Sequence, residues 1–489
     1  MNKNKKIVII TIISLIVLTG IYLLYNTYAL TTKTTNNGDY YTINLTDSNI
    51  VSLAANEEKT VIYQINNTNN GTVSYGVAYN NSNIEVKVYS DSKDKVTGTI
   101  GANDNKYVKL HLKNKTSSNT TVEITAVMGY ENGGDLIVPS ASTLVTKTYT
   151  KSVDFANFAR YITELYTSAS KSTVTNNNIT YNYATSESLM NDRLGGTTSS
   201  LDGGNIRYYG ASPNNYVYFN CESYPSTNCE LWRIIGVFDG KVKLMRNEII
   251  GEYSWDTSAL KVNTGYGINE WSQADLMKLL NPGHESESVG GSLYYNSKSG
   301  KCYSGLNNSS KSCDFTTNGI KNAITRNMIS ETIYNTGGYD TTDIYSNVMY
   351  GQERGTTLIS SPSDGITRKV TWTGKISLPY PSDYGYATDL NKCNQTLLKY
   401  DNSTDSYACR TNDWMYPILG TNSNGWLLTP YSSFARNAFS VRSAGYVNSS
   451  NLNDRICHVL GVVPVLYLNS NQSIAGGDGS QNNPYQLKA

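Results

Sequence analysis

The chain has 489 residues, and its 40 lysines and arginines nearly balance its 39 aspartates and glutamates, for a formal net charge of +1. This balance lacks the basic excess that attracts nucleic acid, so no DNA or RNA partner is expected. The 40 tyrosines, against 7 phenylalanines, and the many Asn, Ser and Thr residues are typical of a soluble β-rich surface protein rather than of a disordered stalk.

The amino-terminal end has the pattern of a membrane anchor. Residues 1–6 contain three lysines and precede an apolar run, residues 7–25, of about the length of a membrane-spanning helix, roughly 20 residues. Basic residues before such a run favour a cytoplasmic amino end. We therefore expect a cytoplasmic tail at 1–6, a transmembrane anchor or cleaved signal segment at 7–30, and an extracellular remainder. The protein would then be a single-pass protein of the cell membrane.

Residues 38–150 alternate between apolar and polar side chains. Val61, Tyr63 and Ile65 are one such run, and clusters of Asn, Gly, Ser and Asp separate it from four others. Short strands at this spacing indicate an antiparallel β-sandwich of immunoglobulin-like type. We interpret this region as a spacer or adhesion module.

The period changes at residues 153–166, where apolar residues recur at helical spacing. Residues 151–200 are therefore expected to form a helical connector, with a second short helix at 186–194. In the region that follows, 201–489, Asp239-Gly240 predicts the turn of a β-hairpin. Helices are expected at 271–280, with Ser272 as N-cap, and at 320–334. Glu353 and Arg354 are expected to form a surface ion pair.

Six of the seven cysteines form three local pairs, each flanking a polar loop. Outside the cell such thiols oxidise, so we predict three disulfides: Cys221 with Cys229, Cys302 with Cys313, and Cys393 with Cys409. A zinc site is the competing interpretation, but the chain has no CxxC motif and only three histidines. Cys457 has no partner. It precedes His458, and since neighbouring strand positions face opposite ways, this pair is not expected to be catalytic.

Residues 426–468 form the segment around which the rest is organised. Its two ends are apolar and predict buried strands, whereas the middle is rich in Tyr, Ser, Asn and Arg, as antibody contact surfaces are. The alternative is that these polar residues only form turns and that the aromatics cover a sheet face. The predicted contact residues are Tyr431, Ser432, Phe434, Arg436, Asn437, Phe439, Arg442, Tyr446, Asn448, Asn451, Asn453, Asp454 and His458.

Several segments carry a family resemblance: ELWRIIGVFDGKVKLMRNEIIGEYSWD, NEWSQADLMKLLNPG, KISLPYPSDYGYATDL, WLLTPYSS, FSVRSAGYVN and GVVPVLYL. Together they resemble uncharacterised surface proteins of gut Firmicutes with a C-type-lectin-like fold, which formylglycine-generating enzymes share. The likeness covers residues 208–487. It implies an α+β head with a helix across a sheet.

The resemblance does not extend to the family's metal or redox chemistry. The tripeptides that bind calcium and sugar in such lectins are not found, and Asn412-Asp413-Trp414 has their letters in another order. The cysteine motif of the formylglycine-generating enzymes has no counterpart either. We therefore expect no metal and no cofactor.

The expected fold is mainly β: a transmembrane helix, an immunoglobulin-like sandwich and a C-type-lectin-like α+β head. The expected function is recognition of an extracellular protein or glycan by a membrane-anchored protein that is not an enzyme. A structural envelope protein is one alternative. The other is a cell-wall-acting hydrolase that uses carboxylates such as Asp383, Asp389 or Asp413.

Overall fold

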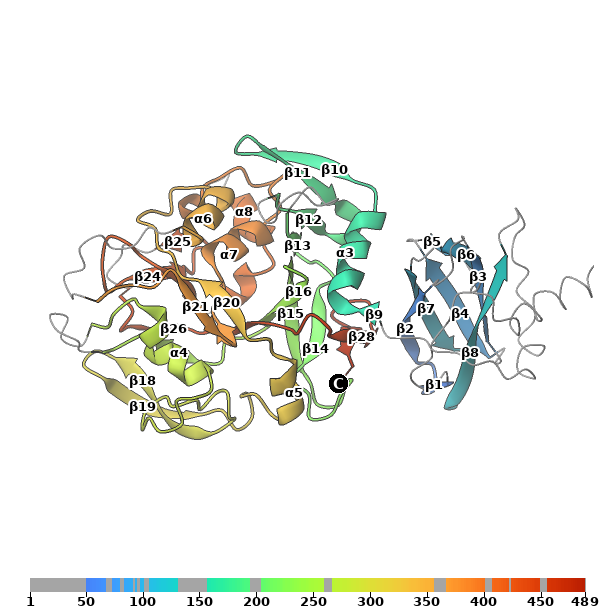
Figure 1. Ribbon diagram of the computed structural model, residues 1–489, viewed down its shortest axis with the longest axis horizontal. Helices are drawn as coiled ribbons and strands as arrows, with labels where there is room; N and C mark the ends of the chain where they lie inside the picture. Colours follow the sequence, from blue (N-terminus) through green and yellow to red (C-terminus); the bar gives the residue numbers. More distant parts are fainter. Residues whose placement is uncertain are drawn as a thin grey trace, which may run out of the picture. The chain divides into compact units, whose positions relative to one another are not determined.

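The protein is mainly β and divides into two compact units, Met1–Ala156 and Asn157–Ala489 (Figure 1). The computed structural model describes residues 50–66, 73–79, 83–90, 93–94, 97–100, 105–130, 156–193, 204–258, 266–355, 366–400, 407–421, 424–448 and 455–488. The tail and the anchor expected at 1–6 and 7–30 lie outside these ranges. Within these ranges, no helix has the length and apolarity needed to cross a membrane.

The first unit contains two four-stranded antiparallel sheets, with strand orders β1-β8-β3-β6 and β2-β7-β4-β5. Its strands are β1 (Ile50–Leu53), β2 (Glu58–Asn66), β3 (Val73–Tyr79), β4 (Ile84–Ser90), β5 (Lys93–Asp94), β6 (Thr97–Ile100), β7 (Asn105–Asn114) and β8 (Thr120–Tyr130). Leu53 and Val122 are buried from one sheet, and Ile84 and Leu112 from the other. Buried side chains on both sheets are what two packed β-layers require.

The segment expected to be a helical connector is only partly helical. After β9 (Ala156–Asn157), helix α3 (Phe158–Ser168) begins where the Asn157 side chain accepts a hydrogen bond from the Arg160 amide. The second short helix is wrong, because β10 (Ser172–Asn176) and β11 (Ile179–Ala184) are followed by a single 3₁₀ turn, η1 (Thr185–Glu187). Ser188 then takes a left-handed backbone conformation and reverses the chain into β12 (Leu189–Asn191).

The main sheet of the second unit continues from these strands through β13 (Ile206–Tyr208) to β15. Its other strands are β14 (Tyr216–Phe219), β15 (Glu230–Phe238), β16 (Lys241–Arg246), β22 (Ile376–Ser377), β27 (Val465–Tyr467), β28 (Ser473–Gly476) and β29 (Tyr485–Leu487). Strands β15 and β16 form the predicted hairpin, in which Asp239 and Gly240 both have positive φ. Helix α3 lies beside this sheet in Figure 1, and its Phe158 and Tyr161 rings pack on Tyr485.

A second, five-stranded sheet has the order β17-β26-β23-β24-β25. These strands are β17 (Glu252–Ser254), β23 (Gly425–Pro430), β24 (Ala438–Val441), β25 (Val447–Asn448) and β26 (Val459–Gly461). Two further antiparallel pairs lie outside it: the hairpin of β18 (Ser299–Gly305) and β19 (Ser309–Asp314), and the pair of β20 (Thr332–Asn335) and β21 (Thr371–Gly374), whose connection contains a helix. The contact segment predicted from the sequence therefore connects strands of the five-stranded sheet.

Short helices surround these sheets (Figure 1). They are η2 (Trp271–Gln273), α4 (Asp275–Leu280), α5 (Ala323–Met328), α6 (Ser346–Glu353), α7 (Pro381–Ala387), η3 (Leu397–Lys399), α8 (Tyr407–Thr411) and α9 (Tyr416–Leu419).

Two of the helices predicted from the sequence are shorter in the structure. Ser272 is not an N-cap: it lies inside η2, and its amide donates to the Glu270 side chain, while Ala274 precedes α4. The helix expected at 320–334 is confined to α5, because the β-branched Thr332 and Ile333 lie in β20 and pair with β21.

The three predicted disulfides are confirmed: Cys221–Cys229, Cys302–Cys313 and Cys393–Cys409. The second of them connects the two strands of the β18–β19 hairpin. Cys457 has a buried free thiol.

Candidate functional site

The predicted contact surface is only partly exposed. Four of its residues, Tyr431, Asn437, Phe439 and Asn448, are buried, so they are removed from it. Phe439 and Asn448 lie in β24 and β25, inside the five-stranded sheet. A side chain in such a position packs against its own protein and has no contact area to offer a ligand.

The remaining predicted residues fall into two groups. Phe434 is 52% exposed, and five others are half-buried: Ser432, Arg436, Arg442, Tyr446 and His458. Asn451, Asn453 and Asp454 lie outside the described residues. The exposed part of the prediction therefore centres on the loop of residues 431–437, which leads into β24.

The side chain of one buried asparagine, Asn269, forms hydrogen bonds with the backbone of this loop. The side-chain amide of Asn269 donates to the backbone carbonyls of Tyr431, Phe434 and Asn437, at 3.0, 3.0 and 2.8 Å. Its own oxygen accepts from Arg368 Nε at 3.0 Å, and Arg368 Nη2 also donates to the Ala435 carbonyl at 3.1 Å. Both Asn269 and Arg368 are buried. The loop backbone is thus fixed before any ligand arrives.

Two arginines converge on one tyrosine beside this loop. The guanidinium carbons of Arg436 and Arg455 lie 4.9 and 5.2 Å from the centre of the Tyr266 ring, and all three residues are half-buried. Phe434 stacks on Tyr431 with ring centres 5.7 Å apart and an interplanar angle of 28°. We call Tyr266, Phe434, Arg436 and Arg455 the aromatic–arginine surface.

Sequence reasoning missed two members of this surface. Arg455 belongs to the same polar run as the predicted residues, and its backbone pairs with that of Asn437. Tyr266 is distant in sequence and stands between two glycines, with no local signal that it would lie near this loop. The backbone next to Tyr266 packs closely against that of Asp256, since a Cβ on Gly267 would lie 2.3 Å from the Asp256 carbonyl oxygen.

Asp256 fixes the segment that carries Tyr266. Its Oδ2 accepts from the Ile268 amide at 2.6 Å, and its Oδ1 accepts from the Asp275 amide at 3.1 Å. Burial, together with the charge of Asp275, raises the pKa of Asp256 to about 7. Both sides of the aromatic–arginine surface therefore rest on buried polar anchors.

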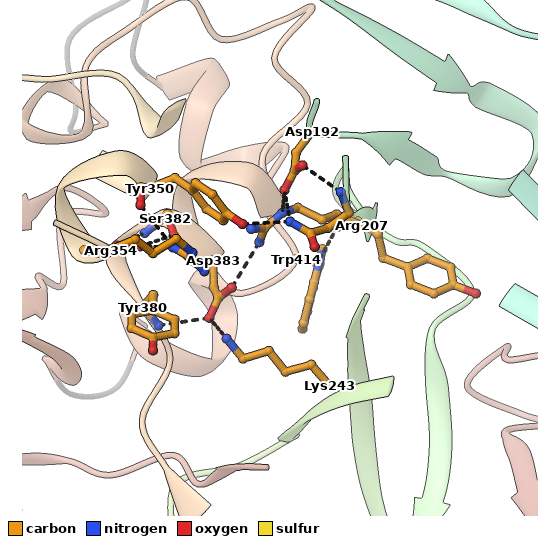
Figure 2. A network of polar contacts seen from close by, with 12 residues as sticks. Asp192, Arg207, Lys243, Tyr350, Arg354, Tyr380, Ser382, Asp383 and Trp414 are labelled. Atoms are coloured by element: carbon orange, nitrogen blue, oxygen red, sulfur yellow. Dashed lines mark hydrogen bonds and ion pairs between the residues drawn. The ribbon is translucent and has the colours of Figure 1, made fainter. Parts of the chain in front are cut away.

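A second cluster of polar groups lies inside the unit (Figure 2). Arg207 of β13 pairs with Asp192 at 2.6 Å and with Asp383 of α7 at 3.0 Å, and Lys243 of β16 pairs with Asp383 at 2.5 Å. All four side chains are almost fully buried. The Arg207 guanidinium also lies over the Phe238 ring, at 4.6 Å. This cluster joins the main sheet to helix α7.

The charges in this cluster neutralise one another. Burial alone would raise the pKa of Asp383, but the charges of Lys243 and Arg207 outweigh it and hold that pKa below its usual value. Burial lowers the pKa of Lys243 to about 8. An aspartate held ionised between two cations serves as their counter-ion, which is a structural role.

The other carboxylates considered for hydrolysis are also engaged. Asp413 is buried, accepts from Thr388 Oγ1 and from the Met415 amide at 2.8 Å each, and has its pKa raised by burial to about 7. Asp389 is half-buried and forms an ion pair with Lys392 at 3.6 Å.

Glu353 and Arg354 form the expected ion pair, but it does not lie at the surface as predicted. The Glu353 side chain is fully buried, and besides Arg354 it accepts from the amide and the hydroxyl of Ser382. Burial raises the pKa of Glu353 to about 7. Ser382 of helix α7 bonds to this carboxylate. The sequence shows only that Glu353 stands next to Arg354, which does not indicate that the glutamate is buried.

Cys457 and His458 lie in a turn before β26 and not in a strand as expected. Burial raises the pKa of the Cys457 thiol to about 11, so the nucleophilic thiolate is scarce near neutral pH. Among the described residues, no three His, Cys, Asp or Glu side chains are grouped so that they could hold a metal ion.

No model of a known protein family matches the chain, and no curated protein is significantly similar to it in sequence.

Proposed function

We propose that this protein recognises an extracellular ligand through the aromatic–arginine surface, while its amino-terminal segment anchors it in the cell membrane. The observation that carries the proposal is the fixed loop of residues 431–437, which exposes Phe434 and carries Arg436, one of the two arginines that lie over the Tyr266 ring. In this proposal the first unit is an immunoglobulin-like spacer and the second a C-type-lectin-like head. The two-sheet arrangement of the first unit and the sequence resemblance of the second support these assignments.

Physical chemistry favours binding at such a surface. Aromatic and arginine side chains dominate the energetics of many interfaces, because they combine a large contact area with directed hydrogen bonds. A loop that is already ordered loses little conformational entropy when it binds. In the free protein the exposed half of the Phe434 ring stays in contact with water and gains nothing from the hydrophobic effect. A ligand that covers this ring would supply that gain.

A screen of the ectodomain, residues 39–489, against arrayed glycans, mucins and bacterial surface proteins tests this function. The screen is run with calcium and with a chelator. Binding that survives the chelator is expected, since no calcium site is invoked. The double variant Phe434→Ala/Arg436→Ala should weaken that binding by about thirtyfold or more, as the loss of hot-spot residues does.

The matched control is Ile333→Ala. Ile333 is 65% exposed in β20, so this variant removes an exposed apolar side chain of an element that does not belong to the proposed surface. It should bind like the wild type. A ligand that binds both variants equally well would refute the proposed site, and a silent screen would refute the recognition function.

A further inference from the structure

We infer that the ligand of the aromatic–arginine surface is an acidic glycan, whose carboxylate or sulfate group is bound by Arg436 and Arg455. This inference rests on the proposed function and adds the chemical class of the ligand.

The first support is the state of the two guanidiniums. Both contact the face of the Tyr266 ring, and in the described part of the chain neither has a carboxylate within ion-pairing distance. A guanidinium that lies over a ring keeps its N–H donors at its edge. Those donors match the two oxygens of a carboxylate or sulfate, which arginine binds bidentately.

The second support is electrostatic. Two cations close to one ring together attract an anion. Their field acts on a neighbour: burial raises the pKa of the Cys457 thiol, whereas Arg455 and Arg436 oppose that rise. The nearby carboxyl group of Asp256 acts on this thiol in the opposite direction, but it is buried, whereas the two arginines are half-exposed.

The third support is the size of the apolar part, which separates a glycan from an acidic protein. A stable protein interface covers about 800 Å² on each partner around an apolar centre. Among the described residues, Phe434 is the one strongly exposed large apolar side chain of this surface, since Leu306, Ile324 and Ile333 belong to other elements. A single flat ring backed by Tyr431 suits the apolar face of one sugar ring.

Binding of the ectodomain to three polymers tests the inference: polygalacturonate, which carries carboxylates, dextran sulfate, and neutral dextran. We expect binding to at least one acidic polymer and none to neutral dextran. Increasing salt should weaken the binding, because exposed charges are screened. Which acidic polymer binds distinguishes a carboxylate ligand from a sulfate ligand.

Variants then assign the binding to the two arginines. The double variant Arg436→Gln/Arg455→Gln keeps most of each side chain but loses the charge, and should weaken acidic-polymer binding at least tenfold. Arg436→Lys/Arg455→Lys keeps the positive charges but loses the planar guanidinium groups, so its affinity for the acidic polymers should lie between those of the wild type and of the glutamine variant. Arg160→Gln removes an exposed arginine of α3 and should bind like the wild type. Tryptophan fluorescence checks that each variant is folded.

The outcomes separate this inference from the proposed function. Acidic-polymer binding that persists in the glutamine variant overturns the inference. Binding of a neutral glycan that depends on Phe434 but not on the arginines also overturns the inference, although the proposed recognition function then stands. The same holds if the ligand that binds through the arginines is an acidic protein. If neither the polymers nor the arrayed ligands bind, both are overturned.

Discussion

Three buried carboxyl groups, Asp256, Glu353 and Asp413, have pKa values raised to about 7, with burial as the main cause. Their usual values are 3.8 for aspartate and 4.5 for glutamate. Between about pH 4 and pH 7 the folded protein therefore holds protons that the unfolded chain has released. By linkage, the free energy of unfolding falls as the pH rises through this window and rises again as the pH is lowered.

Asp413→Asn is expected to flatten this pH dependence. Asparagine stays neutral and can still accept from the Met415 amide, so the variant should lose the part of the slope between pH 5 and pH 7 that Asp413 causes. Lys243, with its pKa near 8, and Asp383, with its lowered pKa, act outside this window. Urea unfolding followed by tryptophan fluorescence at several pH values measures the slope. An unchanged slope would mean that Asp413 is not protonated in the folded state.

Single residues also show which interactions a sequence reveals. The three disulfides could be predicted because each pair is local and flanks one loop. The partners of Arg207 could not, since Asp192 follows the neighbouring strand β12 while Asp383 comes from the distant helix α7. For the same reason the burial of Glu353 was missed, because it depends on Ser382 and on the helix that covers it.

At the scale of elements, the loop of residues 431–437 depends on one side chain. Asn269→Ala removes three hydrogen bonds to the loop backbone and leaves the Tyr431 and Asn437 carbonyls without this donor. We expect a loss of about 1–3 kcal/mol in the free energy of unfolding and faster amide hydrogen exchange in residues 431–437. Ligand affinity should fall as well, since the loop would then lose entropy on binding. Hydrogen exchange read by mass spectrometry localises the effect.

Asn281→Ala is the matched control for this experiment. Asn281 is also buried, and its side chain bonds to the backbone of Met277, Lys375 and Ile376. Its loss should destabilise the unit by a similar amount while leaving exchange in residues 431–437 unchanged. Equal effects of both variants on this loop would show that it responds to overall stability and not to Asn269.

The elements that the sequence predicted well are those with a strong period and a clear turn, such as the β15–β16 hairpin at Asp239-Gly240. Those it predicted poorly are short. The apolar spacing at 320–334 suits a helix, yet the pairing of β20 with β21 decides the state of its second half. Within the predicted contact segment, Phe439 is buried in β24 whereas Phe434 is exposed in a loop, and the composition of the segment does not distinguish these two positions.

At the scale of the whole molecule, the two units differ in their covalent chemistry. All seven cysteines and all six tryptophans lie in the second unit. The disulfides close short loops, with sequence separations of 8, 11 and 16 residues. Loops of this size each stabilise a fold by about 2–4 kcal/mol. Reduction should therefore act on one unit alone.

Calorimetry with and without a reductant tests this expectation. The transition that coincides with the loss of buried-tryptophan fluorescence should shift down by roughly 5 °C or more on reduction, given about 2–4 °C per kcal/mol for large domains. The other transition should not move, because the first unit has no disulfide to lose. Cys457→Ser serves as a control that removes the free thiol, and reduction should shift its transitions by as much as it shifts those of the wild type. If reduction shifted both transitions together, the two units would unfold as one cooperative body.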